Sequence, residues 1–496
     1  MTTQYQTPSN LAQYFSVFRQ QIIGIDVEIP CSMGMQKMVY ADWTASGRLY
    51  NDIEQKMLHT FGQYCANTHT ETNCSGTVMT LAYHEARQII KHHVNAKEGD
   101  ALIMVGSGMT AAINKWQRIL GLRLPEQFHD QIQVPAEQRP VVFITHMEHH
   151  SNQTTWLETI ADVVVIDPTP EGHVQLEHLH YLLEKYAERP LKIAAVTACS
   201  NITGIQTPYH QIAAMMHRAG GWCFVDFACS APYVAIDMHP TDPLEKLDAI
   251  YFSPHKFLGG PGTPGVLIFD TQLYHLKTPD QPGGGTVLWT NPWGGHRYFD
   301  DIEAREDGGT PPFLQTIKTA LAVRLKEQMG IHNIMQREHE LVQRVMPALR
   351  QIKGLHLLAD NVSDRLGVFS FYIDGLHYNL GVRLLNDYFG VQVRGGCSCA
   401  GTYGHYLLNV LPETSQHITD LIDHGDLSAK PGWIRLSIHP TMTDQEVDYC
   451  TDAVRSVAEN FETWQQQYRY DCHTNEFVPI ATTPQQDWAA VVHKWF

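Results

Sequence analysis

The sequence predicts an α/β protein: a mostly parallel, seven-stranded sheet with flanking helices, followed by a smaller C-terminal α/β domain. Three observations predict this fold. Short apolar runs of strand length alternate with amphipathic helical stretches between residues 100 and 270. The runs are almost continuously apolar, which is typical of strands buried on both faces. The chain of 496 residues is also too long for one ordinary core.

Seven apolar runs are predicted to form the sheet. Helical stretches with apolar residues three or four positions apart lie between them, such as 174–188 and 209–220. This alternation indicates βαβ units and therefore parallel strands. The predicted strands are "ALIMV" (101–105), "VVFIT" (141–145), "DVVVID" (162–167), "KIAAVT" (192–197), "CFVDF" (223–227), "AIYF" (249–252) and "GVLIF" (265–269).

The chain after the sheet is predicted to form a second, smaller unit. Residues 277–312 are rich in Gly, Pro and aromatic residues, which predicts a long structured loop with a functional role. A helical stretch begins at residue 314. The smaller domain should contain strands at 367–374, 391–395 and 433–438. The predicted boundaries are 1–50 for an N-terminal segment contributing to the small domain and active site, 51–320 for the large domain, 321–470 for the small domain and 471–496 for a C-terminal tail.

Composition excludes several classes of protein. Acidic residues outnumber basic ones by 17, which argues against a nucleic-acid surface. No apolar run approaches the length that spans a bilayer, so no membrane association is predicted. The ten cysteines are scattered and the N-terminus lacks the pattern of an export signal. Reduced thiols and a cytoplasmic location are therefore expected.

Polar residues gather where the predicted strands end. In open parallel sheets, ligands bind beyond the carboxyl ends of the strands. The first strand leads into "GSGMTAAIN" (106–114), a loop of small residues that opens a helix. One crevice is therefore expected to hold this loop together with His149, Asn201, Asp226 and Lys256.

Each of these features also has a purely structural interpretation. The loop could be an ordinary strand-to-helix turn, or it could hold a phosphate on free backbone N–H groups. Asp226 could belong to a structural ion pair. Lys256 could be a solvated surface residue, and His149 a partly buried loop histidine. The stretch "HMEHH" (146–150) does not match the HExxH pattern, so no metal site is predicted.

Taken together, the four features match the needs of pyridoxal 5′-phosphate. A lysine amine forms a Schiff base with the aldehyde of this cofactor. A carboxylate keeps the pyridine nitrogen protonated, so that the ring acts as an electron sink. An imidazole can stack on the ring face. The lysine must first lose its proton, which burial beside cationic groups favours.

The motifs "MEHHSN" (147–152), "SPHKFLGGPGTPG" (253–265) and "VRGGCSCA" (393–400) resemble those of the class V, fold-type I pyridoxal-phosphate enzymes. Within that family, the chain is most similar to the cysteine desulfurase and selenocysteine lyase group. The resemblance runs from "ADWTAS" (41–46) to "WIRLSIHPT" (433–441). It implies a homodimer with shared active sites that acts on a small amino acid.

The resemblance implies a role for each site residue. Lys256 matches the Schiff-base lysine, Asp226 the partner of the pyridine nitrogen and His149 the ring-stacking histidine. Asn201 matches an asparagine near the cofactor hydroxyl and the substrate carboxylate. Arg435 matches the arginine that clamps this carboxylate, a task suited to bidentate geometry. Further contacts to the cofactor are implied for Gly108, Met109, Thr110, Cys229, Ser253 and His255, and for Thr310 toward the neighbouring subunit.

The resemblance also implies that Cys399 accepts sulfur. L-cysteine or selenocysteine loses its α-proton, for which Lys256 is the expected base. The Cys399 thiolate attacks the substrate sulfur, alanine leaves and a persulfide remains, which a sulfur-acceptor protein could then receive. Only a thiolate is nucleophilic, so the pKa of Cys399 should lie below about 8.5.

The chain departs from its relatives at three places. Cys229 stands where the family usually has Gln, Cys397 stands where a histidine is often found, and the long segment 400–432 is expected to carry an extra helix or lid. Cys397 and Cys399 could also be buried filler, a disulfide formed as a regulatory state, or half of a zinc site lacking two ligands. The alternative function is another class V reaction, such as transamination, epimerisation or β-elimination, without a cysteine nucleophile. A non-catalytic protein that keeps the fold is the third possibility.

Overall fold

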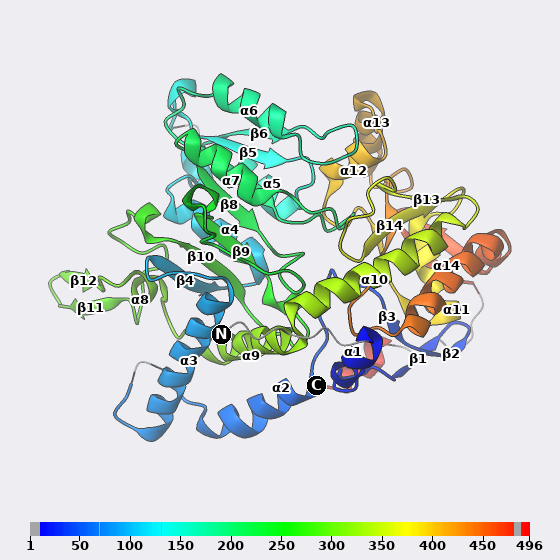
Figure 1. Cartoon of the computed structure of the whole chain (residues 1–496), viewed down its shortest axis with the longest axis horizontal. Helices are drawn as coiled ribbons and strands as arrows, with labels where there is room; N and C mark the ends of the chain where they lie inside the picture. Colours follow the sequence, from blue (N-terminus) through cyan, green and yellow to red (C-terminus); the bar gives the residue numbers. More distant parts are fainter. Residues whose placement is uncertain (1–9, 69, 130, 481–487) are drawn as a thin grey trace. The chain divides into compact units, whose positions relative to one another are not determined.

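The computed structural model describes residues 10–68, 70–129, 131–480 and 488–496. The chain divides into two compact units, coloured along the sequence in Figure 1. Unit 1 comprises Met1–Ala45, Asn201–Gly204 and Gln336–Phe496, and unit 2 comprises Ser46–Ser200 and Ile205–Met335.

Unit 2 is built on a seven-stranded sheet, as predicted. Strand β10 is antiparallel to both of its neighbours, and every other neighbouring pair in the sheet is parallel. The mostly parallel sheet is thus confirmed. In spatial order its strands are β4 (Asp100–Val105), β10 (Gly265–Asp270), β9 (Ala249–Phe252), β8 (Trp222–Asp226), β7 (Lys192–Thr197), β5 (Val141–Thr145) and β6 (Asp162–Ile166).

Helices pack on the sheet and bury its apolar side chains. Trp116 of α4 is fully buried, with its ring centroid 5.6 Å from that of Phe224 in β8 and 4.4 Å from that of Phe269 in β10. This packing fixes α4 across the sheet (Figure 1). The helices of unit 2 are α2 (Asn51–Lys56), α3 (Cys74–His93), α4 (Gly108–Ile119), α5 (His150–Leu157), α6 (Leu176–Lys185), α7 (Tyr209–Arg218), α8 (Ile302–Glu306) and α9 (Phe313–Met329).

Replacing Trp116 with Ala should lower the free energy of unfolding by about 3–5 kcal/mol, because it leaves a large cavity between α4 and the sheet. Denaturant unfolding followed by circular dichroism measures this loss. Tyr181, which is 55% exposed on α6, provides the control, and Tyr181→Ala should change stability by less than about 0.5 kcal/mol. Equal losses in the two variants would contradict this account of the core.

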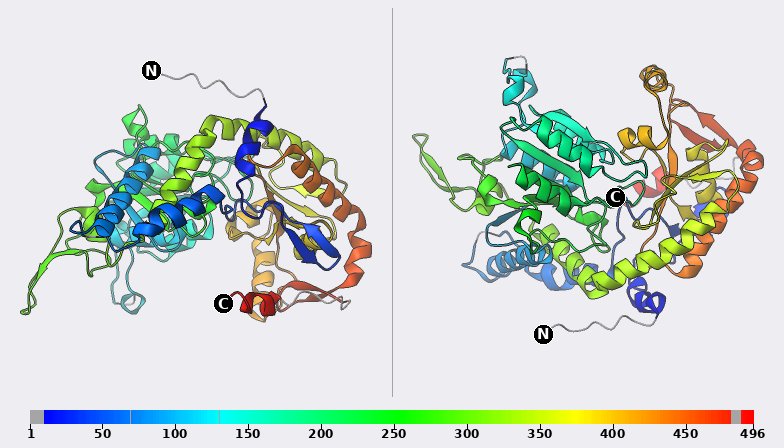
Figure 2. Two further views of the ribbon diagram at one scale, coloured as in Figure 1. Left: turned by 90° about the horizontal axis from the view of Figure 1, so that it is seen from below. Right: turned by 45° about the horizontal axis from the view of Figure 1, so that its top comes forward.

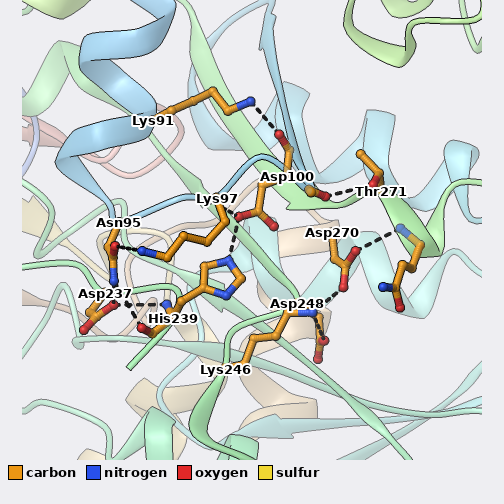
Figure 3. A network of polar contacts seen from close by, with 12 residues as sticks. Lys91, Asn95, Lys97, Asp100, Asp237, His239, Lys246, Asp248, Asp270 and Thr271 are labelled. Atoms are coloured by element: carbon orange, nitrogen blue, oxygen red, sulfur yellow. Dashed lines mark hydrogen bonds and ion pairs between the residues drawn. The ribbon is translucent and has the colours of Figure 1, made fainter. Parts of the chain in front are cut away.

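Ionic contacts occupy the amino edge of the sheet (Figure 3). Asp100 begins β4 and accepts hydrogen bonds from Lys97 N at 2.7 Å and from His239 Nε2 at 2.6 Å. Lys246 forms ion pairs with Asp270 and, at 3.8 Å, with Asp248. The opposite, carboxyl edge is where the predicted site residues of unit 2 lie.

The loop predicted over 277–312 contains regular structure that the sequence analysis did not predict. Strands β11 (Val287–Thr290) and β12 (His296–Tyr298) form an antiparallel hairpin, and α8 follows it. The hairpin extends away from the sheet of unit 2 (Figure 2). Most of its side chains are exposed, including Trp293 at 88%. The hairpin was not predicted because its strands have only three or four residues, too few to show a clear alternation of apolar and polar side chains.

Unit 1 contains a four-stranded antiparallel sheet in the order β13 (Leu355–Leu357), β14 (Val368–Ile373), β17 (Trp433–Ser437) and β16 (Arg394–Gly396). Its further strands are β1 (Glu28–Cys31), β2 (Gly34–Lys37), β3 (Val39–Tyr40), β15 (Val391–Gln392), β18 (Tyr468–Asp471) and β19 (Glu476–Pro479). Its helices are α1 (Leu11–Arg19), α11 (Tyr378–Phe389), α12 (Gly401–Leu407), α13 (Pro412–Asp423), α14 (Asp444–Trp464) and α15 (Trp488–His493), and α10 (Ile331–Arg350) begins in unit 2 and continues into unit 1.

The structure corrects the prediction of one strand over 391–395. Gln392 pairs with Tyr40 in β3, whereas Arg394 pairs with Arg435 in β17. The run therefore changes partner at Val393, because the N-terminal segment supplies hydrogen-bonding groups to its first half. The segment 400–432 contains α12 and α13, so the extra helix expected there is present. No helix among the described residues has both the length and the apolarity to cross a membrane.

Candidate active site

Four strands deliver the predicted site residues of unit 2 to the carboxyl edge of its sheet. β8 ends at Asp226, and β9 leads into Ser253 and a short helical turn, Pro254–Lys256. β4 leads into α4 and β5 leads into α5. Because these strands run in the same direction, their ends meet at one edge.

Asp226 and Lys256 lie in the same region of this edge. The Asp226 side chain is buried, and its Oδ1 accepts a hydrogen bond from Ala228 N at 2.8 Å. Burial raises the pKa of Asp226 to about 6, while the Ala228 hydrogen bond and the positive charge of Lys256 act to lower it. Within the described ranges, no basic nitrogen lies within 4.0 Å of this carboxylate. The structure thus does not show the close ion pair that was the structural interpretation of Asp226.

The loop before α4 is packed too tightly to accept side chains. Ser253 Oγ accepts a hydrogen bond from Met109 N at 2.8 Å. A Cβ atom on Gly108, which has φ +63°, would lie 2.9 Å from that oxygen. A Cβ on Gly265 would lie 2.1 Å from Gly108 O. These close contacts fix the backbone at the start of α4 against Ser253 and Gly265, at the edge of the sheet where a helix N-terminus can hold a phosphate.

Two hydroxyl groups join the beginnings of α4 and α5. Thr110 Oγ1 lies 2.6 Å from Ser151 Oγ. His149 is the N-cap of α5, and its Nδ1 accepts a hydrogen bond from Ser151 N at 3.1 Å. An Nδ1 that accepts leaves the proton of a neutral imidazole on Nε2.

His255 immediately precedes Lys256. Burial and the charge of Lys256 lower the pKa of His255 to about 4, so His255 is neutral at pH 7.

Cys229 and Thr310 lie farther along unit 2. The Cys229 thiol is buried and donates to Ser200 O at 3.7 Å, so it is engaged with the backbone after β7. Thr310 is exposed and lines a surface cavity of about 870 Å³ that also borders Gly106 and Ala111. The predicted role of Thr310 toward a neighbouring subunit stays a prediction.

The other predicted site residues, Asn201, Arg435 and Cys399, belong to unit 1. Arg435 is 2% exposed; its Nη2 donates to Asp42 Oδ1 at 2.7 Å and its Nη1 to Asn201 O at 3.2 Å. Arg394 Nε donates to the other oxygen of Asp42 at 3.1 Å. Sequence reasoning missed Asp42, although it lies in the quoted motif "ADWTAS".

Three of the predicted or neighbouring residues of this group each have a buried polar atom without a hydrogen-bond partner among the described residues. The atoms are Arg435 Nε, Asn201 Oδ1 and Ser398 Oγ. Asn201 Nδ2 donates to Ser398 O at 2.8 Å, which connects the first two residues to the turn that carries the thiols. Buried polar groups are almost always hydrogen-bonded in folded proteins, so these three atoms are available to a polar ligand.

The two thiols lie in a hydrogen-bonded turn of unusual conformation. Ala400 N donates to Cys397 O at 3.0 Å, and the two central residues, Ser398 and Cys399, have φ of +49° and +59°. Left-handed conformations of residues other than Gly cost of order 1–3 kcal/mol each and cluster at functional sites. Cys399 is exposed and Cys397 partly buried, and all ten cysteines are free thiols. No group of three potential metal ligands occurs in the described parts of the chain.

Replacing Asp226 with Asn should stabilise the ligand-free protein at neutral pH. A buried carboxyl whose pKa is raised from 3.8 to about 6 loses its stabilising contribution as the pH rises through that range. The full cost above pH 6 is about 3 kcal/mol. Denaturant unfolding at pH 4 and pH 8 measures it: the variant should be more stable than the wild type at pH 8 only. The same gain at pH 4 would contradict this cause.

Comparisons with known proteins agree with this arrangement. Residues 39–450 match the family described as aminotransferase class-V. A probable cysteine desulfurase of Staphylococcus epidermidis is 28% identical over 369 residues, covering 74% of this chain and 84% of the relative. A probable cysteine desulfurase of Halalkalibacterium halodurans is 27% identical over 371 residues, covering 73% and 84%.

Solved structures share the fold. A cysteine desulfurase from Thermococcus onnurineus NA1 superimposes with a TM-score of 0.69 at 22% identity, covering 85% of this chain and 95% of that one. The cysteine desulfurase CsdA from Escherichia coli gives 0.68 at 21% identity, covering 91% and 98%. At these identities the likeness is one of fold.

Proposed function

Because the chain belongs to the class V aminotransferase family, we propose that it is a pyridoxal 5′-phosphate enzyme that cleaves the C–S or C–Se bond of cysteine or selenocysteine. The products are L-alanine and a persulfide on Cys399 in the case of cysteine. The observation that carries the proposal is Asp226, a buried carboxylate whose pKa is influenced by the positive charge of Lys256 and which shares an edge of the sheet with the start of α4. Among the described residues, no basic nitrogen lies within 4.0 Å of it.

The residues of unit 2 fit the cofactor. Gly108, Met109 and Thr110, with Ser253 and His255, would hold the phosphate. Asp226 would accept a hydrogen bond from the protonated ring nitrogen. The positively charged pyridinium would then be the partner that a buried carboxylate requires. His149 would lie against the ring face, with Cys229 as a further contact. The bound ring supplies an electron sink for the substrate carbon that loses a proton.

Lys256 would carry the cofactor covalently and then move the proton. Its amine has to lose a proton before it reacts, and the partly buried position beside a neutral His255 suits this. Once the substrate amine has replaced it, Lys256 would take the proton from the substrate α-carbon. Asp226, as an anion, would keep the ring nitrogen protonated during this transfer.

Arg435 Nε and Asn201 Oδ1 would bind the α-carboxylate and α-amine of the substrate. Arg435 Nε is a charged donor suited to an α-carboxylate, and Asn201 Oδ1 is an acceptor beside it. Asp42 holds the guanidinium of Arg435 from the other side, which fixes its orientation. A small amino acid with a free carboxylate is therefore the proposed substrate class.

The Cys399 thiolate would attack the sulfur of the substrate. A bond forms between the two sulfur atoms, the bond between the substrate sulfur and its carbon breaks, and the electron pair of that bond remains on the carbon that becomes the methyl group of alanine. The exposure of Cys399 on a strained turn supports access by the substrate sulfur and then by an acceptor protein. A homodimer in which Thr310 reaches the phosphate of a second copy completes the proposal.

An amino-acid panel tests this function. Purified protein loaded with pyridoxal 5′-phosphate is incubated with cysteine, selenocysteine and other amino acids, and alanine, sulfide, selenide and keto acids are measured. Alanine formed only from cysteine or selenocysteine, in amounts equal to the transferred or released chalcogen, is the expected result. Keto acid from a wider range of amino acids would instead indicate a transaminase, and failure to bind the cofactor would refute the proposal altogether.

A further inference from the structure

Glu148 is a buried carboxylate immediately before His149 that the proposed reaction does not use. It is 2% exposed and accepts four hydrogen bonds. Its Oε1 accepts from Thr145 N at 3.2 Å, from Thr145 Oγ1 at 2.7 Å and from Thr197 N at 2.9 Å. Its Oε2 accepts from Asn152 Nδ2 at 2.7 Å. These donors come from the end of β5, the end of β7 and the first turn of α5.

The orientation of the Asn152 amide is set by groups with only one possible role. Trp156 Nε1 can only donate, and it lies 3.4 Å from Asn152 Oδ1. Ala195 O can only accept, and it lies 3.1 Å from Asn152 Nδ2. Tyr251 Oη, on β9, donates to the same Oδ1 at 2.8 Å. The amide nitrogen therefore faces Glu148.

Three of the four groups around the Glu148 oxygens, Thr145 N, Thr197 N and Asn152 Nδ2, can only donate. The fourth, Thr145 Oγ1, is a hydroxyl that also accepts from Met147 N at 3.2 Å. Burial and the negative charge of Asp226 raise the pKa of Glu148 to about 7, whereas these hydrogen bonds favour the anion. No basic nitrogen within the described ranges comes within 4.0 Å of it, so hydrogen bonds replace the usual cation.

The hydrogen bonds of Glu148 connect the turn before α5 with strand β7. The turn 146–149 leaves β5 and enters α5 at His149, and Glu148 bonds to the residues on both sides of that turn. It also bonds to Thr197, which is paired in the sheet with Asp226. A single side chain thus joins the backbone that carries His149 to the strand beside Asp226.

We propose that Glu148 is a positioning residue of the cofactor site, whose hydrogen-bonded side chain fixes the turn from which His149 reaches the ring of pyridoxal 5′-phosphate. The inference rests on the proposed function, because it concerns the same cofactor. The sequence patterns indicated no role for this residue. A Glu just before a helix, as in "MEHHSN", is usually an exposed polar residue, whereas Glu148 is buried.

The test compares Glu148→Gln with the wild type in cofactor binding. An amide of the same size would present its NH2 group to at least one of the four donors and would loosen the turn. The cofactor-free protein is titrated with pyridoxal 5′-phosphate, and the visible circular dichroism of the bound cofactor reports its fixed orientation. We expect about tenfold weaker binding, equivalent to about 1.4 kcal/mol, and a reduced dichroic signal.

A double-mutant cycle separates positioning from general damage. If Glu148 acts through His149, adding Glu148→Gln to His149→Ala should weaken binding by less than twofold more than His149→Ala alone. Asp248→Asn is the matched control: Asp248 is a buried carboxylate at the amino edge of the same sheet that accepts from Cys223 N at 2.8 Å (Figure 3). It should lower thermal stability without changing cofactor affinity or dichroism.

Several outcomes would overturn the inference. Unchanged affinity and dichroism in Glu148→Gln would do so, as would a full tenfold loss in the His149→Ala background, or an equal loss in Asp248→Asn. If Glu148→Gln does not fold, Thr145→Val removes one donor only, and the same cycle is then run with an expected two- to threefold loss. A wild type that does not bind the cofactor would refute the proposed function instead.

Discussion

Replacing Lys256 with Ala should abolish turnover of the proposed substrate, lowering kcat/KM by at least about 1,000-fold. Proton transfer by a positioned base alone contributes about 100- to 10,000-fold. The variant also loses the covalent link to the cofactor, which should then dissociate on dialysis. Alanine release and the visible absorbance of the dialysed protein measure the two effects separately.

Lys326 is the lysine most able to compete with Lys256 for this role. It is 3% exposed in α9, and burial lowers its pKa to about 7. However, its Nζ lies 2.7 Å from Ala231 O, 2.5 Å from Val234 O and 3.1 Å from His93 Nε2, so three acceptors already hold the amine. A buried amine bonded in this way serves the structure rather than the cofactor.

Borohydride reduction followed by peptide mass analysis distinguishes the two lysines without any mutation. The cofactor mass should be found on the peptide that contains Lys256. Attachment at Lys326, or undiminished turnover in Lys256→Ala, would contradict the assignment. Lys246→Ala, at the opposite edge of the sheet, is the control and should keep both the cofactor and the activity (Figure 3).

Replacing Cys399 with Ala should remove persulfide formation and lower alanine release from cysteine by at least about 100-fold. The reason is that the thiolate supplies the nucleophile for the substrate sulfur, and alanine has no group to replace it. Cofactor absorbance should stay at the level of the wild type, because the residues proposed to hold the cofactor are unchanged. Alkylation of the protein after one turnover, followed by mass analysis, would detect the added sulfur atom.

Cys397→Ala is the matched control for this experiment, since it removes a thiol from the same turn. Cys397 is partly buried and Cys399 exposed, so the turnover of Cys397→Ala should remain within about threefold of the wild type. Full activity in Cys399→Ala would favour a class V reaction without a cysteine nucleophile. Sulfur found on Cys397 in the wild type would exchange the roles of the two thiols.

Several elements of the molecule could be predicted from local pattern. The seven sheet strands are almost continuously apolar, as expected for strands buried on both faces, and the runs "VVFIT" and "KIAAVT" predict the bounds of β5 and β7 correctly. Parallel strands end at one edge, which is why Asp226 and Lys256 could be expected together before any coordinates. The hairpin at 287–298 escaped this reasoning because its strands are only three or four residues long. The change of partner at Val393 escaped it because the N-terminal segment supplies the hydrogen bonds to the first half of that run.

The sequence by itself determined the sheet, the strand ends and the residue types placed there, because burial and alternation act over a few neighbouring residues. Only the tertiary structure decided how distant residues combine. Asp42 binds Arg435 across 393 positions of the chain, and Glu148 meets Thr197 across 49. A hydrogen bond made by a side chain to a distant residue leaves no local periodicity in the sequence, so such pairs become visible only when the chain is folded.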